Sequence, residues 1–262
     1  MPVLAIVSVF AYAGLPPVDL DQALAACSVD PVHPLPILSA DQKQALRDGE
    51  VVRILNQHKD QPSTAVGLAL LKAPREALWV ACQDPHAQVD PSLTEFIVES
   101  RGPDRKLWYG YFDLPRPLQD RQWVVESNNN HRMAQKTGQR CWEHTWVLEE
   151  DGLERVRSTV ERDQPRGITL DHLDRAIFTP TNRGSWTMAD LGDGTVLTAY
   201  SASSTVGGLI PDWLVARLAK SRLESVLRSL EARANTWSLK HYRAGHEPLA
   251  AGDGTPIAPF TN

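Results

Sequence analysis

The residue best placed for chemistry is His144, which lies between Trp142 and Trp146 at alternate positions of a stretch typical of a β-strand. An imidazole can transfer a proton near neutral pH or form a hydrogen bond to a bound polar group. Glu143 is the adjacent acid, but strand alternation places it on the opposite face, so the two side chains cannot act together. His144 could equally be a buried histidine that is hydrogen-bonded to a neighbouring carbonyl, and the sequence leaves both interpretations open.

Elsewhere, few residues have the spacing that chemistry requires. The chain has no Gly-x-Ser-x-Gly turn, no Gly-x-x-x-x-Gly-Lys loop, no Gly-x-Gly-x-x-Gly motif and no His-Glu-x-x-His motif. Cys27, Cys82 and Cys141 are too far apart for a zinc or Cys-x-x-Cys site, and their odd number predicts no disulfide framework. We expect Cys82 and Cys141 to be small buried apolar residues. The sequence therefore predicts no catalytic residue, no metal site and no cofactor.

Composition places these residues in a globular protein. The chain has 262 residues, of which 42% are hydrophobic and 23% charged, enough to bury one large core or two small ones. With 27 Lys and Arg against 32 Asp and Glu, the net charge is -5, which makes nucleic acid an unlikely partner on electrostatic grounds. Eight tryptophans outnumber the five tyrosines and the five phenylalanines.

The amino terminus resembles an export signal without its basic start. An apolar run over residues 3–10 precedes Ala11-Tyr12-Ala13, a small-x-small pattern that signal peptidase accepts. We therefore expect residues 1–14 to be a signal segment, which would make the protein periplasmic or secreted, whereas a retained segment would leave it cytoplasmic. Residues 15–38 are rich in proline and are predicted to be a lead-in to the domain.

The rest of the chain predicts a sheet followed by a long helix. Helices are expected over 40–47 and 74–82, and 169–176 suits either a short helix or an ordered loop. A long amphipathic helix begins at Pro211, and the tail over 238–262 is expected to be loose or lightly docked. Strands are expected over 50–55, 64–71, 93–100, 106–114, 122–127, 140–149, 154–162, 184–190 and 195–203.

Alternation assigns faces to these strands. The inward face predicted for one strand carries Trp142, His144, Trp146 and Leu148, and another strand places Trp108 and Phe112 on one side with Gly110 between them. Gly110 is expected to leave space in mid-strand. A long sheet covered by a single helix has more apolar surface than that helix can fill, so we predict an internal cavity. The alternative is a solid aromatic core.

Three local strings resemble the START lipid-transfer domains, part of the helix-grip superfamily typified by birch-pollen-allergen-like proteins. They are Ala73–Trp79, Leu114–Trp123 and Gly207–Leu214, and the resemblance covers 39–237 and suggests a bacterial-type member. It implies an α+β helix-grip fold, in which a curved antiparallel β-sheet wraps around a long C-terminal α-helix with an internal hydrophobic tunnel.

The resemblance also implies a function without chemistry. Such a domain binds a hydrophobic small molecule or lipid, as carrier or sensor, with transient membrane contact; the sequence leaves the ligand and the oligomeric state open. His144, Arg162 and Thr187 are candidates to contact a head group. The candidate tunnel-lining residues are Trp108, Phe112, Trp142, His144, Trp146, Leu148, Leu214 and Leu218. Gly207 and Gly208 would form a gating hinge, and Asp120, Arg121, Pro211 and Trp213 are expected to be structural.

Two other functions remain open from the sequence. An aromatase or cyclase on the same fold would use His144 and Tyr109 to steer proton transfers on a polyketide-like substrate. A structural or regulatory module would bind a protein partner through the tail, and it would have a filled core and no extractable ligand.

Overall fold

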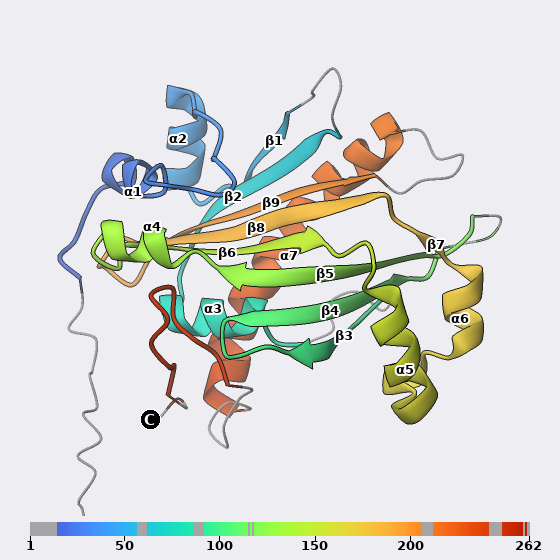
Figure 1. Cartoon of the computed structure of the whole chain (residues 1–262). Coiled ribbons are helices and arrows are strands. Elements are labelled where there is room, and N and C mark those ends of the chain that lie inside the picture. The colour runs from blue at the N-terminus through green and yellow to red at the C-terminus, as the bar shows by residue number, and fades with distance from the viewer. Residues whose placement is uncertain are drawn as a thin grey trace, which may run out of the picture.

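Nine strands form one sheet in the part of the chain that the structure describes, in the order β1-β2-β9-β8-β6-β5-β4-β3, with the short β7 beside β5 (Figure 1). The computed structural model describes residues 15–56, 62–85, 92–114, 116, 118–205, 212–240, 248–258 and 260, with side chains of the last helix described over 220–236. Every strand pair along this order is antiparallel, and β7 runs parallel to β5. The strands are β1 (Val52–Asn56), β2 (Thr64–Leu71), β3 (Leu93–Ser100), β4 (Arg105–Phe112), β5 (Arg121–Asn129), β6 (Cys141–Leu148), β7 (Ile177–Phe178), β8 (Thr181–Asp190) and β9 (Val196–Thr205).

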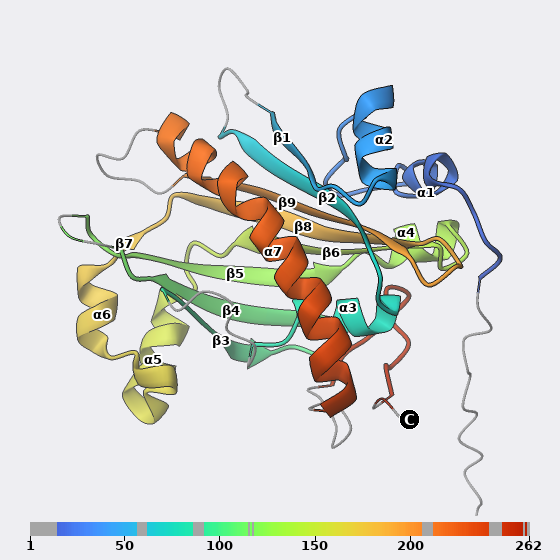
Figure 2. The same cartoon turned by 180° about the vertical axis from the view of Figure 1, so that it is seen from behind.

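One long helix, α7 (Asp212–Lys240), crosses one face of this sheet diagonally (Figure 2). We call this face the inner face, and it carries Trp142 and Trp186, which share a buried cluster with Leu227 of α7. The helix approaches closely at Gly67 of β2, where an added Cβ would lie 3.1 Å from Leu223 and Leu227 side-chain atoms. An antiparallel sheet with a long C-terminal helix across it confirms the predicted α+β class.

The opposite face, the outer face, is covered by shorter helices at both ends. Buried residues of α1 (Leu20–Ala26), α2 (Ala40–Arg47) and α4 (His131–Lys136) pack on β2, β9, β8 and β6. Those of α5 (Leu153–Asp163) and α6 (Leu170–Arg175), which are joined by a 3-10 turn at Pro165–Gly167, pack on β3, β4 and β5 (Figure 1). Neither face of the sheet is therefore left to solvent along its whole length.

The proline-rich lead-in contains α1, a helix that the proline pattern concealed. Asp19 caps it, because the Asp19 carboxylate accepts from the Gln22 amide while the Gln22 side chain accepts from the amide of Asp19. The buried side of α1 presents Leu20 and Ala23 to the sheet.

The strand predicted over 154–162 is wrong: this segment is α5. Val156, Ser158 and Val160 alternate as in a strand, yet Val156 and Val160 are also four apart, which is one helical turn. In the structure both valines are buried against the outer face. The segment left open over 169–176 is helical as α6.

The tail was expected to be loose or lightly docked, and residues 248–258 are docked against the core. Leu249, Ala250 and Ala251 are buried. Trp79 of α3 (Arg75–Cys82) donates from Nε1 to the Ala250 carbonyl oxygen at 2.9 Å, and the Ala250 amide donates to Pro103 at 3.0 Å. The end of the chain is thus part of the structure around α3.

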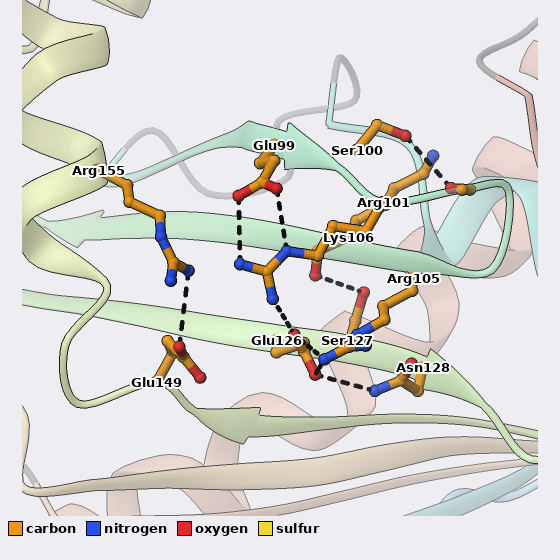
Figure 3. A network of polar contacts seen from close by, with 11 residues as sticks. Glu99, Ser100, Arg101, Arg105, Lys106, Glu126, Ser127, Asn128, Glu149 and Arg155 are labelled. Carbon is orange, nitrogen blue, oxygen red and sulfur yellow. Dashed lines mark hydrogen bonds and ion pairs between the residues drawn. The ribbon is translucent and has the colours of Figure 1, made fainter.

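A network of ionic contacts joins β3, β4 and β5 on the outer face (Figure 3). Glu126, with only 12% of its side chain exposed, accepts from Arg101 and from Arg105, and Arg101 also contacts Glu99 at 3.1 Å. These contacts cross three neighbouring strands, so the network fixes the register of that edge. In the described part of the chain, no helix combines the length and the apolar character needed to cross a membrane.

Candidate functional site

The inner face brings together most of the aromatic residues predicted to line a tunnel. Strand register places Trp108, Val125 and Leu148 side by side on β4, β5 and β6. It places His144 beside Trp186 on β8, which in turn lies beside Tyr200 on β9. Directly opposed residues of a sheet share a face, so these six side chains lie on the same side of the sheet as α7.

Three rings form a continuous aromatic group in the middle of this face. The Trp146 and Tyr200 rings stack with centroids 5.6 Å apart, and Tyr200 contacts Trp186 at 4.5 Å. The Trp146 indole donates from Nε1 to the Asn182 side-chain oxygen at 3.0 Å, so its polar atom is satisfied within the protein. Trp146 can therefore present apolar ring surface to the inner face while its own donor is paired.

Burial divides the predicted lining residues into two sets. Trp142 is fully buried and His144 nearly so. Trp108, Phe112, Trp146 and Leu148 keep part of their surface exposed, although they point to the inner face. On the outer face of the same strands, Tyr109 and Val124 are fully buried under α5 and α6. The β4–β6 half of the inner face thus retains apolar surface that the described residues do not cover completely.

Gly110 was expected to leave space, but that space is filled. A Cβ at Gly110 would lie 2.2 Å from the indole of Trp123, which sits beside it on β5. The glycine therefore admits a tryptophan from the neighbouring strand instead of opening a void.

His144 is held in one tautomer by a chain of hydrogen bonds. Asn129 donates from its side-chain nitrogen to the Ala250 carbonyl oxygen at 3.1 Å, which orients its amide oxygen toward His144 Nδ1 at 2.7 Å. An amide oxygen only accepts, so Nδ1 carries the hydrogen and Nε2 keeps its lone pair. Burial, followed by the charge of Lys106, lowers the pKa of His144 to about 3. The imidazole is therefore neutral, with one acceptor atom.

The depressed pKa of His144 predicts acid sensitivity. Because the unfolded histidine has a pKa near 6.5, the unfolded state binds more protons between pH 6.5 and about 3, and stability falls as the pH is lowered through that window. Between pH 5.5 and 4.5 we expect a loss of about 1 kcal/mol from this group. Urea titrations of the wild type and of His144→Gln should show a shallower pH dependence in the variant. Equal slopes would contradict the assignment.

Charged groups also contribute to the inner face, and the sequence analysis missed them. Glu95 lies opposite Gly110 on β3, and desolvation raises the pKa of its carboxyl group while Arg233 of α7 and Arg166 oppose that rise. Burial, together with the charge of Glu95, raises the pKa of Tyr200. The available signal was an acid between Leu93 and Ile97, two apolar residues on the same side of the strand.

The remaining candidates do not lie at this face. Arg162 is exposed on α5, and Thr187 is buried on the outer face opposite Glu143, so neither head-group assignment holds. Tyr109 is also on the outer face, where its hydroxyl donates to Gln122, and it cannot act with His144. The two residues proposed for a cyclase therefore face opposite sides of the sheet.

Two of the four residues expected to be structural, Asp120 and Arg121, lie where β5 begins. Asp120 accepts from the Tyr111 hydroxyl and from the Leu114 amide, and buried Arg121 donates to the Gln119 carbonyl oxygen. Their partners are the turn itself and the adjacent strand. Gly207, Gly208 and Pro211 lie outside the described residues, as do the side chains of Trp213, Leu214 and Leu218.

The described residues contain no group of three or more His, Cys, Asp or Glu side chains that could hold a metal ion. No protein-family model matches the sequence, and no curated protein matches it significantly.

Solved structures of lipid-transfer domains share the fold. The STAR-related lipid transfer protein of Xanthomonas axonopodis is similar with a TM-score of 0.54 and 17% identity, over 71% of this chain and 94% of that one. Human STARD10 is similar with a TM-score of 0.53 and 11% identity, over 82% of this chain and 87% of that one. An aromatase/cyclase from a Streptomyces species has a TM-score of 0.40 and 14% identity, over 66% of this chain and 93% of that one. The first two of these structures show that the chain has the START helix-grip fold, as the resemblance predicted.

Proposed function

We propose that this protein binds one hydrophobic, lipid-like molecule between the inner face of its sheet and α7, and carries or senses it without chemical change. The observation that carries this proposal is the set of inward apolar side chains that stay partly exposed: Trp108, Phe112, Trp146 and Leu148. Each CH₂ group removed from water stabilises a complex by about 0.8 kcal/mol, so a chain of about ten carbons could gain roughly 8 kcal/mol before association costs.

Polar groups of the same face would orient the ligand. Glu95 and Arg233 are near enough for the charge of Arg233 to lower the pKa of Glu95 against the effect of desolvation. His144 Nε2 is an acceptor that suits a hydroxyl or amide donor of the ligand. Leu214 and Leu218 of α7 remain predicted lining residues of the binding site. Gly207 and Gly208 remain a predicted hinge. Transient contact with a membrane would deliver the ligand.

Two neighbouring residues on β6 allow a matched test. Leu148 lies on the inner face, and Val147, 54% exposed, lies on the outer face. Leu148→Gln should weaken binding of a fluorescent fatty-acid analogue roughly 10-fold or more, since a buried leucine contributes about 1.5–3 kcal/mol. Val147→Gln should leave the affinity unchanged.

The wild type decides between the open functions. Native mass spectrometry of detergent-free protein, followed by lipid analysis, is expected to detect a stoichiometric apolar molecule, and fluorescence titration should show uptake of the analogue. An empty protein that takes up no analogue would overturn the proposal and favour the partner-binding module. An equal loss in both β6 variants would show that binding occurs away from the inner face.

A further inference from the structure

Two cysteines that are distant in the sequence meet between α1 and β6. Cys27, which ends α1, and Cys141, which begins β6, are separated by 114 residues, yet their Sγ atoms lie 2.8 Å apart. Both residues are buried, with exposed fractions of 1% and 0%. This proximity was not predictable, because the spacing of cysteines alone cannot show that a helix in the lead-in reaches the sheet.

Each cysteine is held in place by its own element. The Cys27 amide donates to the Ala23 carbonyl oxygen at 3.1 Å, at the end of the capped helix α1. Cys141 pairs with Ala189 of β8, and its amide donates to the Thr137 hydroxyl at 3.1 Å. A disulfide has a bonded distance of about 2.05 Å, so the two sulfur atoms need to move together by only about 0.8 Å.

The alternatives for two adjacent thiols are weaker. Metal binding needs further ligands, and the described residues hold no group of three His, Cys, Asp or Glu side chains suited to a metal. A reactive thiol needs a lowered pKa and access to solvent. Burial and the neighbouring Cys27 instead raise the pKa of Cys141, so the folded thiol is unreactive toward reagents in solution.

We propose that Cys27 and Cys141 form an intramolecular disulfide when the chain folds in an oxidising environment, and that Cys82 remains a thiol. The two thiols lose two protons and two electrons as the S–S bond forms, and a disulfide oxidant such as oxidised glutathione takes them up and leaves as two thiols. Cys82 lies on α3, where its thiol contacts the Trp79 carbonyl oxygen instead of another cysteine. The bond would fasten α1, and with it the start of the described chain, to the sheet.

The test uses the full chain refolded in a glutathione redox buffer, then denatured, alkylated without reductant and digested. We expect one alkylated cysteine, Cys82, and a Cys27–Cys141 linked peptide. Three alkylated cysteines, or a disulfide that includes Cys82, would overturn the proposal. This outcome needs no variant and is independent of ligand binding.

Stability provides a second readout with a matched control. Reductant should lower the Tm of the oxidised wild type, and equally of Cys82→Ser, by roughly 5–15 °C. Cys27→Ser should show no response to reductant. A response to reductant that persists in Cys27→Ser, or that disappears in Cys82→Ser, would assign the effect to another pair and overturn the proposal.

Discussion

Replacing Trp79 with alanine is expected to lower the free energy of unfolding by about 3–5 kcal/mol. The side chain is fully buried, and its ring contacts the Trp142 ring with centroids 5.2 Å apart and the His144 ring at 5.9 Å. Its Nε1 also holds the Ala250 carbonyl oxygen. The substitution therefore removes a large apolar contact and the hydrogen bond that anchors the C-terminal segment.

Urea unfolding followed by circular dichroism measures this effect. Trp79→Phe keeps most of the ring but loses the donor, so it should lie between the wild type and the alanine variant. Leu118→Ala serves as the control, because that side chain is 43% exposed and its removal should change stability by less than about 0.5 kcal/mol. A loss below about 1 kcal/mol in Trp79→Ala would mean that the C-terminal segment and α3 are not packed as described.

Replacing Glu143 with alanine is expected to cost about 3 kcal/mol, because three partly buried donors lose a charged acceptor. This fully buried carboxylate accepts from the Val32 amide at 2.8 Å, the His33 amide at 2.9 Å and the Asn130 side chain at 2.7 Å. The substitution should lower the free energy of unfolding and should also loosen the lead-in locally, since two of these hydrogen bonds hold the lead-in against the outer face.

Hydrogen exchange tests the local part of this prediction. The amides of Val32 and His33 should exchange faster in Glu143→Ala, whereas Glu150→Ala, at an exposed acid beyond the other end of β6, should leave both amides protected. Glu143→Gln should be intermediate, because it retains one acceptor oxygen. Unchanged exchange at both amides in Glu143→Ala would contradict the anchoring role.

The sheet was largely predictable because its strands obey a period of two. The stretches 64–71 and 93–100 match β2 and β3 at both ends, and alternation correctly placed Trp142, His144 and Trp146 on the inner face. Alternation is a local property of the sequence, so it can be recognised without knowing which strands pair with one another. The same property failed at α5, where valines at positions 156 and 160 satisfy both the strand and the helix period.

The site was predictable only in part, because several of its contacts join distant segments. Trp123 fills the space above Gly110 from a neighbouring strand, and Ala250 reaches Trp79 from the end of the chain. Nothing in the sequence near Gly110 or near the tail encodes these partners. The pairing of Cys27 with Cys141 has the same origin, since it depends on where a short, unpredicted helix docks.

The packed C-terminal segment also sets the moment at which folding can finish. Trp79 and its acceptor Ala250 are 171 residues apart, so at a synthesis rate of about 5–20 residues per second the tryptophan waits roughly 9–34 seconds for its partner. For most of that time β2 lacks β9 as well, because the ninth strand, Val196–Thr205, follows most of the sheet in the sequence. The nascent chain therefore has an unpaired strand edge until β9 has been made and unburied indole surface until Ala250 has been made, and both features favour aggregation during that interval.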